Sequence, residues 1–344
     1  MPPTTQKALL LERVNGEFYT SARPVPKPAP GELLVKIQAF ALNPVDYKIQ
    51  HSDFFFMKHF PAVLGSDIAG DVEVVGEGVQ GWAKGDRVFF QGNLADSDYA
   101  AFQQYALVPS DLAIKCPENT SYEQASTIPV AFMAAAYGLL APEPMGAGLY
   151  DAQVKFSGSS AFVLGGSTSV GQYVIQLLKF HGFSQIIAYA SGHQTQFLKS
   201  LGATDVIDRK KVPLDDLPVA LEQHLTNELK ITYDAVGSPE TQQAGNLCTL
   251  PGGILISTMP HKTVDLGDFG KKFFNPMAVV YLPECREFGR VICGNLEEWL
   301  RTGVVIPSIV EALPVGLEPV LSGLERLRNN QVSGVKLVGR PDPV

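Results

Sequence analysis

The residues with the clearest chemical use form one run of small side chains near the middle of the chain. An apolar segment at 161–164 precedes the run and is typical of a buried strand, and apolar residues at helical spacing follow it, from Tyr173 to Leu178. Small side chains let the backbone approach a pyrophosphate, and a helix N-terminus offers unpaired N–H groups and a positive dipole end. Strand, turn and helix in this order predict the start of a dinucleotide-binding βαβ unit. We expect the cofactor to contact Gly165, Gly166, Ser167, Thr168, Ser169 and Val170.

The stretch after this turn indicates which dinucleotide binds. An NAD enzyme usually places an acidic side chain on the ribose hydroxyls about 20 residues beyond the turn. Residues 152–204 contain no Asp or Glu, although the chain has 35 of them. A carboxylate would repel a 2′-phosphate, whereas hydroxyl, imidazole and guanidinium groups bind one. We therefore expect NADPH, held at its adenosine end by Ser191, Gly192, His193, Gln194 and Arg209. The alternative is that the acid-free stretch is accidental and that Ser191 and His193 only shape a loop.

Composition argues against several classes of partner. A net charge of −8 disfavours nucleic acid and anionic membrane surfaces. No run of apolar residues is long enough to span a bilayer, and the N-terminus does not resemble a secretion signal. The 4 Cys residues lack the close spacing of a zinc site or a disulfide framework. We expect a cytoplasmic protein with reduced thiols, no metal, no membrane segment and no nucleic-acid partner.

The elements around these residues predict an α/β protein with two domains. Short β-like runs separated by Gly and Pro fill residues 1–125, with strands expected at 33–37, 71–75 and 88–90. Residues 126–290 alternate strands, expected at 161–164, 185–190, 204–207, 231–236 and 253–257, with helical stretches. That alternation is typical of a doubly wound parallel sheet. After residue 290 we expect helices at 296–301 and 317–328 and β-runs at 308–313 and 335–338, returning to a discontinuous first domain of 1–125 and 291–344.

Several segments in this order resemble the medium-chain dehydrogenase/reductase superfamily over nearly the whole chain. They are similar to its zinc-independent quinone oxidoreductase branch and, within that branch, to the fungal trans-acting enoyl reductases. The resemblance rests on Asn43-Pro44-Val45-Asp46, on Leu64-Gly65-Ser66-Asp67 with Ala69-Gly70, on Ser191-Gly192-His193-Gln194, and on the ending Val332 to Val338. It implies a Rossmann NADPH-binding domain at 126–290 and a β-rich GroES-like catalytic domain built from the two outer segments.

The departures from the superfamily's zinc enzymes concern the metal ligands. Asn43 stands where those enzymes have Cys, Ser66 where they have His, and the third ligand position falls near Ala131. None of the three side chains binds zinc well. The resemblance therefore implies a reductase that works without the Lewis acid that zinc supplies. Within the fungal group, Arg209 stands where Tyr is expected.

The resemblance also implies residues near the reacting end of the cofactor. We expect Asn43, Val45, Asp46 and Lys48 beside the nicotinamide, Tyr47 as the donor of a proton to an enolate carbon, and Lys48 as an oxyanion stabiliser. The local alternative is that Asn43-Pro44 starts a turn, that Asp46 caps a helix and that Tyr47 is a half-buried surface residue. Solvent water could then supply the proton.

Further candidates fall at strand ends, in the tail and in apolar stretches. Strand ends and tail predict cofactor contacts for Val236, Ile256, Ser257, Val332 and Ser333. Apolar stretches predict a substrate pocket lined by Phe54, Phe56, Phe132, Met133, Tyr137 and Phe274. For the stretch 129–140, the alternative is the buried core of a helix.

These observations favour an NADPH-dependent reductase of an activated C=C bond in an enal, an enone or an enoyl thioester. Its substrate would be a small molecule or an acyl thioester, free or bound to a carrier, and the protein a monomer or a homodimer. Quinone reduction needs the same fold and cofactor and stays open. So does a non-enzymatic role in which NADPH binding serves regulation.

Overall fold

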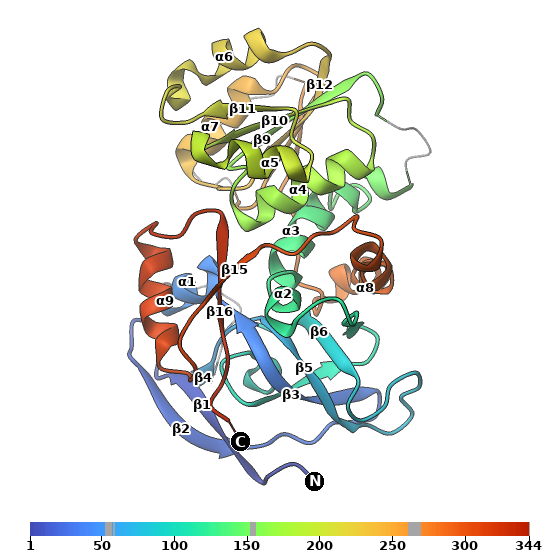
Figure 1. The fold of residues 1–344 in the computed structure, drawn as a ribbon, viewed down its shortest axis with the longest axis vertical. Helices are drawn as coiled ribbons and strands as arrows, with labels where there is room; N and C mark the ends of the chain where they lie inside the picture. Colours follow the sequence, from blue (N-terminus) through green and yellow to red (C-terminus); the bar gives the residue numbers. More distant parts are fainter. Residues whose placement is uncertain (52–56, 58, 152–155, 261–269, 344) are drawn as a thin grey trace. The chain divides into compact units, whose positions relative to one another are not determined.

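The computed structural model describes residues 1–51, 57, 59–151, 156–260 and 270–343, and it folds into two compact units (Figure 1). The first unit comprises Met1–Val130, Val279–Thr302 and Pro307–Val344. The second comprises Ala131–Ala278 and Gly303–Ile306. The first unit is therefore assembled from separate stretches of the chain.

A parallel sheet forms the centre of the second unit. In the described part of the chain it has six strands in the order β11-β10-β9-β12-β13-β14. Counted along this unit the order is 3-2-1-4-5-6, which is that of a doubly wound dinucleotide-binding fold. The strands are β9 Ser159–Leu164, β10 Gln185–Ala190, β11 Asp205–Asp208, β12 Glu228–Asp234, β13 Ile254–Ser257 and β14 Lys272–Phe274. The order reverses between β9 and β12, where such sheets bind ligands at the carboxyl ends of the strands.

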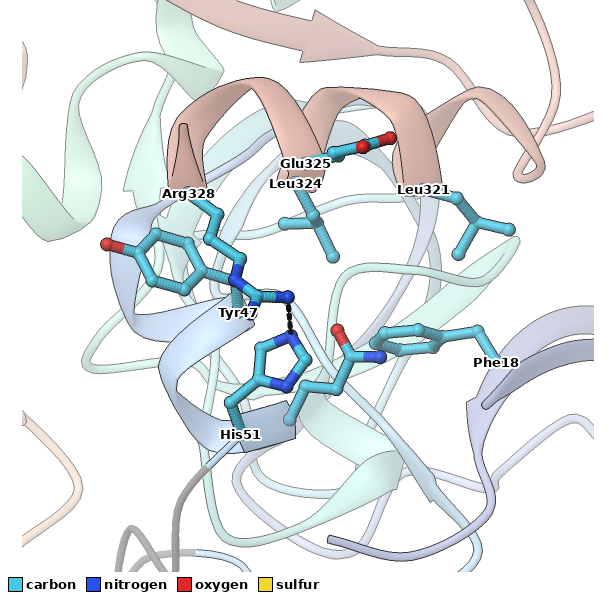
Figure 2. A pocket seen from close by; sticks show the side chains of 8 residues that line it. Phe18, Tyr47, His51, Leu321, Leu324, Glu325 and Arg328 are labelled. Atoms are coloured by element: carbon cyan, nitrogen blue, oxygen red, sulfur yellow. Dashed lines mark hydrogen bonds between the residues drawn. The ribbon is translucent and has the colours of Figure 1, made fainter. Parts of the chain in front are cut away.

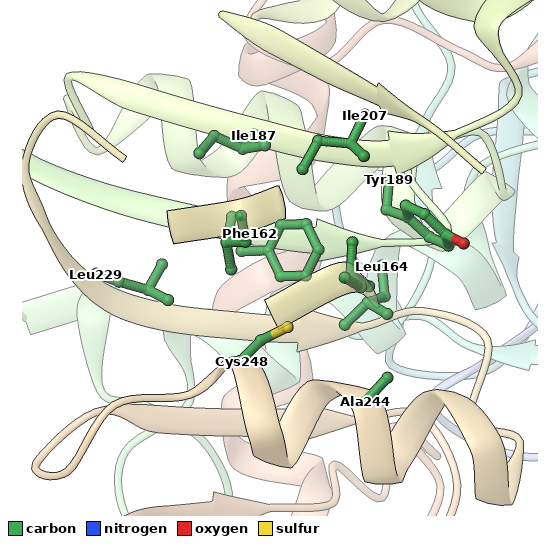
Figure 3. Packing of buried hydrophobic residues seen from close by; sticks show 10 residues of the cluster. Phe162, Leu164, Ile187, Tyr189, Ile207, Leu229, Ala244 and Cys248 are labelled. Carbon is green, nitrogen blue, oxygen red and sulfur yellow. The ribbon is translucent and has the colours of Figure 1, made fainter. Parts of the chain in front are cut away.

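Helices accompany this sheet, with α4 beside α5 and α6 beside α7 (Figure 1). They are α3 Pro129–Leu140, α4 Ser169–Phe180, α5 Thr195–Leu201, α6 Leu217–His224 and α7 Pro239–Cys248, with the short 3₁₀ turns η2 Leu149–Asp151, η3 Gly192–Gln194 and η4 Leu214–Asp216. Figure 3 shows the apolar packing among these elements, with Phe162 of β9, Ile187 of β10 and Cys248 of α7 in one cluster. All six residues of β10 are buried, which explains its nearly continuous apolar sequence.

The first unit is built on mainly antiparallel sheets, in which β15 and β16 pair in parallel. In the described residues one sheet has the order β15-β16-β3-β5-β6-β8, with β7 also pairing with β3, and a second has the order β2-β1-β4. The strands are β1 Thr5–Leu11, β2 Phe18–Pro24, β3 Glu32–Ala41, β4 Ala62–Val63, β5 Asp67–Val75, β6 Arg87–Gln91, β7 Tyr105–Pro109, β8 Ile114–Lys115, β15 Ile309–Ala312 and β16 Val335–Gly339. Through β16 the end of the chain joins the edge of β3, where Val338 pairs with Ala41.

The helices of the first unit are α1 Pro44–His51, α2 Tyr122–Ser126, α8 Pro283–Arg301 and α9 Pro319–Arg328, with the 3₁₀ turn η1 Ser97–Tyr99. Helix α1 follows β3 directly and packs against α9. The first unit therefore places the Asn43–Lys48 segment next to elements from the last 30 residues of the chain.

The expected fold class is confirmed, because the molecule combines a doubly wound parallel sheet with a β-rich unit. Two elements differ from the expectation. Strand β14 was not expected, and α8 begins at Pro283 rather than at residue 296. The expected boundary at residue 290 thus falls inside α8, whose buried residues Phe288, Ile292 and Leu296 recur at helical spacing on both sides of it.

No helix in the described residues is long and apolar enough to cross a membrane.

Candidate functional site

The turn between β9 and α4 has the close packing that small residues permit. Gly165 has a φ of +74°, which disfavours other residues, and a Cβ there would lie 2.5 Å from the Val236 side chain. A Cβ on Gly166 would lie 2.8 Å from that of Ala188 on β10. The two glycines therefore let the turn settle against the neighbouring strands.

Helix α4 presents unpaired donors at its N-terminus. Thr168 is the N-cap, and its hydroxyl accepts a hydrogen bond from the Gly171 N–H at 3.0 Å. Within the described residues, the N–H groups of Ser169 and Val170 have no protein acceptor. The first turn of the helix carries no acidic residue. The combined dipole and free N–H groups suit a phosphate, so this turn can hold a pyrophosphate.

The ends of β12 and β13 lie beside this turn. Val236 is exposed, and its side chain lies where a Cβ on Gly165 would point. Ile256 and Ser257 are fully buried. The Ser257 hydroxyl is 3.2 Å from the Asp234 carboxylate and 3.1 Å from the Gln242 amide. Val236 is thus available to a ligand, whereas the side chains of Ile256 and Ser257 are used inside the unit.

The structure brings Arg209 and Ser191 together at the ends of β11 and β10. The Arg209 Nε donates a hydrogen bond to the Ser191 hydroxyl at 2.9 Å, although 18 positions separate the two residues. His193 and Gln194, both in η3, lie within hydrogen-bonding distance of each other at 3.2 Å. Four residues expected at the adenosine end therefore share one corner of the second unit.

Sequence reasoning missed an acid in this corner. The Asp208 carboxylate accepts hydrogen bonds from the N–H groups of Gly192 and Lys210, each at 3.0 Å. The Lys210 N–H is the main cause that lowers the pKa of Asp208. Asp208 lies opposite Ala190 in the parallel ladder. The acid-free stretch ends at residue 204, and only the pairing of β10 with β11 shows that residue 208 adjoins residue 192.

In the first unit, Asp46 turns back onto the start of its own helix. Its carboxylate accepts a hydrogen bond from the Asn43 N–H at 2.7 Å, while the Asp46 N–H donates to the Asn43 carbonyl at 3.0 Å. Asp46 has no exposed surface. This geometry matches the local alternative, in which Asp46 caps a helix, and it leaves the carboxylate inaccessible to a cofactor.

The Asn43 side chain is enclosed by a buried ion pair. Its amide donates to Asp67 at 2.8 Å and accepts from the Lys336 ammonium at 2.5 Å. Lys336 also lies 3.0 Å from Asp67, with side-chain exposures of 5% and 0%. Asp67 and Lys336 were not expected in the site, although both belong to segments that carry the family resemblance. The network joins the start of α1 to β5 and β16.

The charges in this network act on Asp46. The pKa of Asp46 is raised from 3.8 to about 7, mainly by burial and also by the nearby Asp67, while the Asn43 N–H and Lys336 oppose the shift. A carboxyl group in this position holds its proton more tightly than one in water.

The donor set around Asn43 does not fit zinc. Asn43 is saturated by Asp67 and Lys336, Ser66 has a fully buried hydroxyl, and Ala131 offers no donor atom. A lysine ammonium beside the amide also disfavours a dication by charge repulsion. Among the described residues, no group of three or more His, Cys, Asp or Glu could hold a metal ion.

Tyr47, Lys48 and Val45 of α1 are partly exposed. Burial raises the pKa of Tyr47, and the charge of Arg328 partly offsets this. Burial lowers the pKa of Lys48. Tyr47 therefore keeps its proton at neutral pH, and Lys48 is easier to deprotonate than a lysine in water.

The expected substrate-pocket residues have different environments. Phe132, Met133 and Tyr137 are fully buried in α3, and Phe132 meets Tyr173 edge-to-face at 5.6 Å. This arrangement agrees with the alternative that α3 is a core helix. Phe274 is also buried, in β14. Phe54 and Phe56 lie outside the described residues.

The two expected tail residues lie between α9 and β16. Val332 is partly exposed and Ser333 is exposed, and Lys336 follows three residues after Ser333. The tail that could contact a ligand is therefore held at one end by the buried pair of Lys336 and Asp67.

Two family models match the chain. Residues 29–118 match the alcohol dehydrogenase GroES-like domain, and residues 169–279 match the zinc-binding dehydrogenase domain. The second match includes helix α4 and the corner at Arg209, and the first includes Asn43 and Asp67.

Curated relatives come from fungi. The chain is 30% identical to the trans-enoyl reductase tndF of Aspergillus flavipes, over 96% of this chain and 98% of the relative. It is 34% identical to the dehydrogenase azaJ of Aspergillus niger, where the match spans 62% of each protein.

Solved structures share the whole fold. A protein of the alcohol dehydrogenase superfamily from Novosphingobium aromaticivorans has a TM-score of 0.81 and 25% identity, over 98% of this chain and 100% of that one. A mycobacterial protein solved in complex with NADPH has a TM-score of 0.78 and 21% identity, over 98% and 100%.

Proposed function

Because the chain belongs to the medium-chain dehydrogenase/reductase superfamily, in the branch of the fungal trans-enoyl reductases, we propose that it is an NADPH-dependent reductase of an activated C=C bond. In this proposal the second unit binds the cofactor and the first unit carries the catalytic side chains. One observation carries this proposal. The free N–H groups at the start of α4 and the Arg209–Ser191 pair all follow the carboxyl ends of neighbouring parallel strands in the second unit.

The charge balance at the adenosine end favours NADPH over NADH. Three consecutive cations, Arg209, Lys210 and Lys211, follow β11, and one acid, Asp208, precedes them. The Asp208 carboxylate already accepts hydrogen bonds from two backbone N–H groups, those of Gly192 and Lys210. Cationic side chains with an ordered hydroxyl are suited to a phosphate monoester.

The side chains of the first unit would serve orientation and proton transfer. Bound NADPH supplies a hydride to the electron-poor carbon of the substrate. Tyr47, which burial keeps protonated, is available to donate a proton to the neighbouring carbon. Lys48 would stabilise negative charge on the substrate oxygen. Asn43 and Asp46 are positioning residues in this proposal, since both are enclosed by the protein.

The proposal includes no metal, because the residues at the superfamily's zinc position do not form a zinc-binding set. Lys336 brings a positive charge to that position, hydrogen-bonded to Asn43. The expected substrates are therefore conjugated alkenes, in which the hydride acceptor is already electron-poor, rather than simple alcohols that depend on a Lewis acid.

The test is NADPH oxidation by the purified chain with a linear enal, a cyclic enone, an enoyl thioester, a quinone and a simple aldehyde. We expect chelator-resistant oxidation with the alkenes and a saturated product identified by mass spectrometry. Reaction with the quinone alone would replace this proposal by quinone reduction. NADPH binding without turnover of any substrate, carrier-bound enoyl thioester included, would favour a regulatory role.

A further inference from the structure

A cavity in the first unit shares one residue, Tyr47, with the site proposed above, and its other lining residues have no role in the proposed reaction. It lies between α1, α9 and the start of β2 and has a volume of about 240 Å³. In Figure 2 the apolar side chains of Leu321 and Phe18 lie on one side, and Arg328, Tyr47 and His51 lie on the other. Its lining consists of Phe18, Tyr47, Gln50, His51, Leu321, Leu324, Glu325 and Arg328.

Arg328 lines the cavity without an ion pair to any described residue. Its Nη1 lies 3.1 Å from the His51 Nε2. Because a guanidinium can only donate, that ring nitrogen accepts and His51 is neutral. Burial and the charge of Arg328 lower the pKa of His51, in agreement with this state. Among the described residues no carboxylate forms an ion pair with Arg328, Glu325 of the same helix included. As far as the described residues are concerned, its remaining N–H groups are therefore available to an anion.

The apolar side of the cavity gives the ligand a second requirement. Leu324 is 3% exposed and forms a buried apolar part of the lining, which Leu321 and Phe18 extend. A volume of 240 Å³ lies below the roughly 300–1,000 Å³ of sites for drug-sized ligands. The ligand is accordingly small and joins one anionic group to an apolar body.

We propose that this cavity is a binding site for a small monocarboxylate with an apolar body, its carboxylate on Arg328 and its body on Leu321, Leu324 and Phe18. A planar carboxylate matches the fork of one guanidinium. A phosphate dianion fits less well, because the cavity offers one cation and Glu325 lies in its lining. The proposal does not depend on the reductase function, since binding requires neither cofactor nor turnover.

The test measures binding by calorimetry and by ligand-detected NMR on the full chain without NADPH. Benzoate and hexanoate are the probes, benzamide and hexanamide their uncharged counterparts, and inorganic phosphate the competing anion. We expect saturable binding of the carboxylates, at least about tenfold tighter than that of the amides, as a charge-assisted hydrogen bond implies. Phosphate should bind more weakly than benzoate.

Two variants of α9 make the assignment specific. Arg328→Gln should weaken benzoate binding at least about tenfold, because it removes the charge and keeps much of the side chain. The matched control is Arg326→Gln, since Arg326 is committed to Glu311 at 2.6 Å and does not line the cavity. It should bind benzoate like the wild type. Thermal unfolding checks that both variants are folded.

The apolar wall has its own variant. Leu321, which is 41% exposed, can be replaced without opening the core, and Leu321→Ser should weaken hexanoate more than acetate. Any of four results would overturn the proposal. They are equal binding of amides and carboxylates, unchanged affinity in Arg328→Gln, tighter binding of phosphate than of benzoate, and no binding of either carboxylate. NADPH oxidation measured on the same samples separates that result from failure of the reductase assignment.

Discussion

The two polar centres of this molecule differ in whether their groups are already satisfied. At the corner of the second unit, the N–H groups of Ser169 and Val170 have no acceptor among the described residues, and Arg209 is exposed. Around Asn43 in the first unit, by contrast, amide, carboxylate and ammonium are buried and bound to each other. Unsatisfied groups at a surface can bind a ligand, whereas a closed network holds the elements that carry it. We therefore propose that the first set binds the cofactor and that the second positions the elements around it.

The largest expected effect is on the buried pair. Lys336→Met should lower the free energy of unfolding by about 3–5 kcal/mol, because it leaves the buried Asp67 without its counter-charge. Chemical denaturation of variant and wild type measures the change.

Lys272→Met is the matched control. Lys272 pairs with Glu143 at 2.6 Å, but both side chains are more than half exposed, so the loss should stay below about 1 kcal/mol. Similar losses in the two lysine variants would contradict the distinction between a closed network and a surface pair.

The next effect is the pH dependence that Asp46 brings. Its pKa is about 7 in the folded protein and near 3.8 in an unfolded chain. Between these values the unfolded chain releases a proton that the folded protein keeps, so stability falls as pH rises from about 4 to about 7. The contribution of this group is on the order of 4 kcal/mol.

Asp46→Asn removes that titration while keeping an oxygen for the Asn43 N–H. Unfolding free energies at pH 4.5 and pH 8 should therefore differ less in the variant than in the wild type, with the variant favoured at pH 8. An unchanged pH dependence would mean that Asp46 is ionised in the fold.

A smaller effect is expected on cofactor affinity at Arg209, in the corner of the second unit. Arg209→Ala should weaken NADPH binding about tenfold and change NADH binding little, because only NADPH carries the phosphate that the guanidinium would bind. Cofactor fluorescence titration gives both dissociation constants. Lys199→Ala, an exposed cation in the last turn of α5, should affect neither. Equal losses for the two cofactors would refute the phosphate role of Arg209.

The smallest effect concerns the acid beside that corner. Asp208→Asn keeps an acceptor for the Gly192 and Lys210 N–H groups and removes one negative charge. NADPH affinity should rise about two- to fivefold, and this gain should shrink at high salt. A loss of NADH affinity larger than the NADPH gain would instead identify Asp208 as a ribose ligand.

The sequence alone determined the parts of this protein that depend on local pattern. Apolar runs, glycines and helical periodicity predicted the doubly wound sheet, the turn at Gly165 and the start of α4, because backbone geometry and burial act within a few residues. They did not reveal β14, a strand of three residues, or the first turns of α8, whose apolar stripe continues beyond the expected boundary.

Only the tertiary structure decided which distant residues share a site. The pairing of β10 with β11 brings Asp208 to Gly192, and the pairing of β16 with β3 brings Lys336 to Asn43, 293 positions away. In our proposal, these contacts make Asn43 and Asp46 buried positioning residues rather than ligand contacts. The reason is physical: a side chain's type sets which bonds it can form, but long-range strand pairing sets which partners reach it and whether any capacity remains for a ligand.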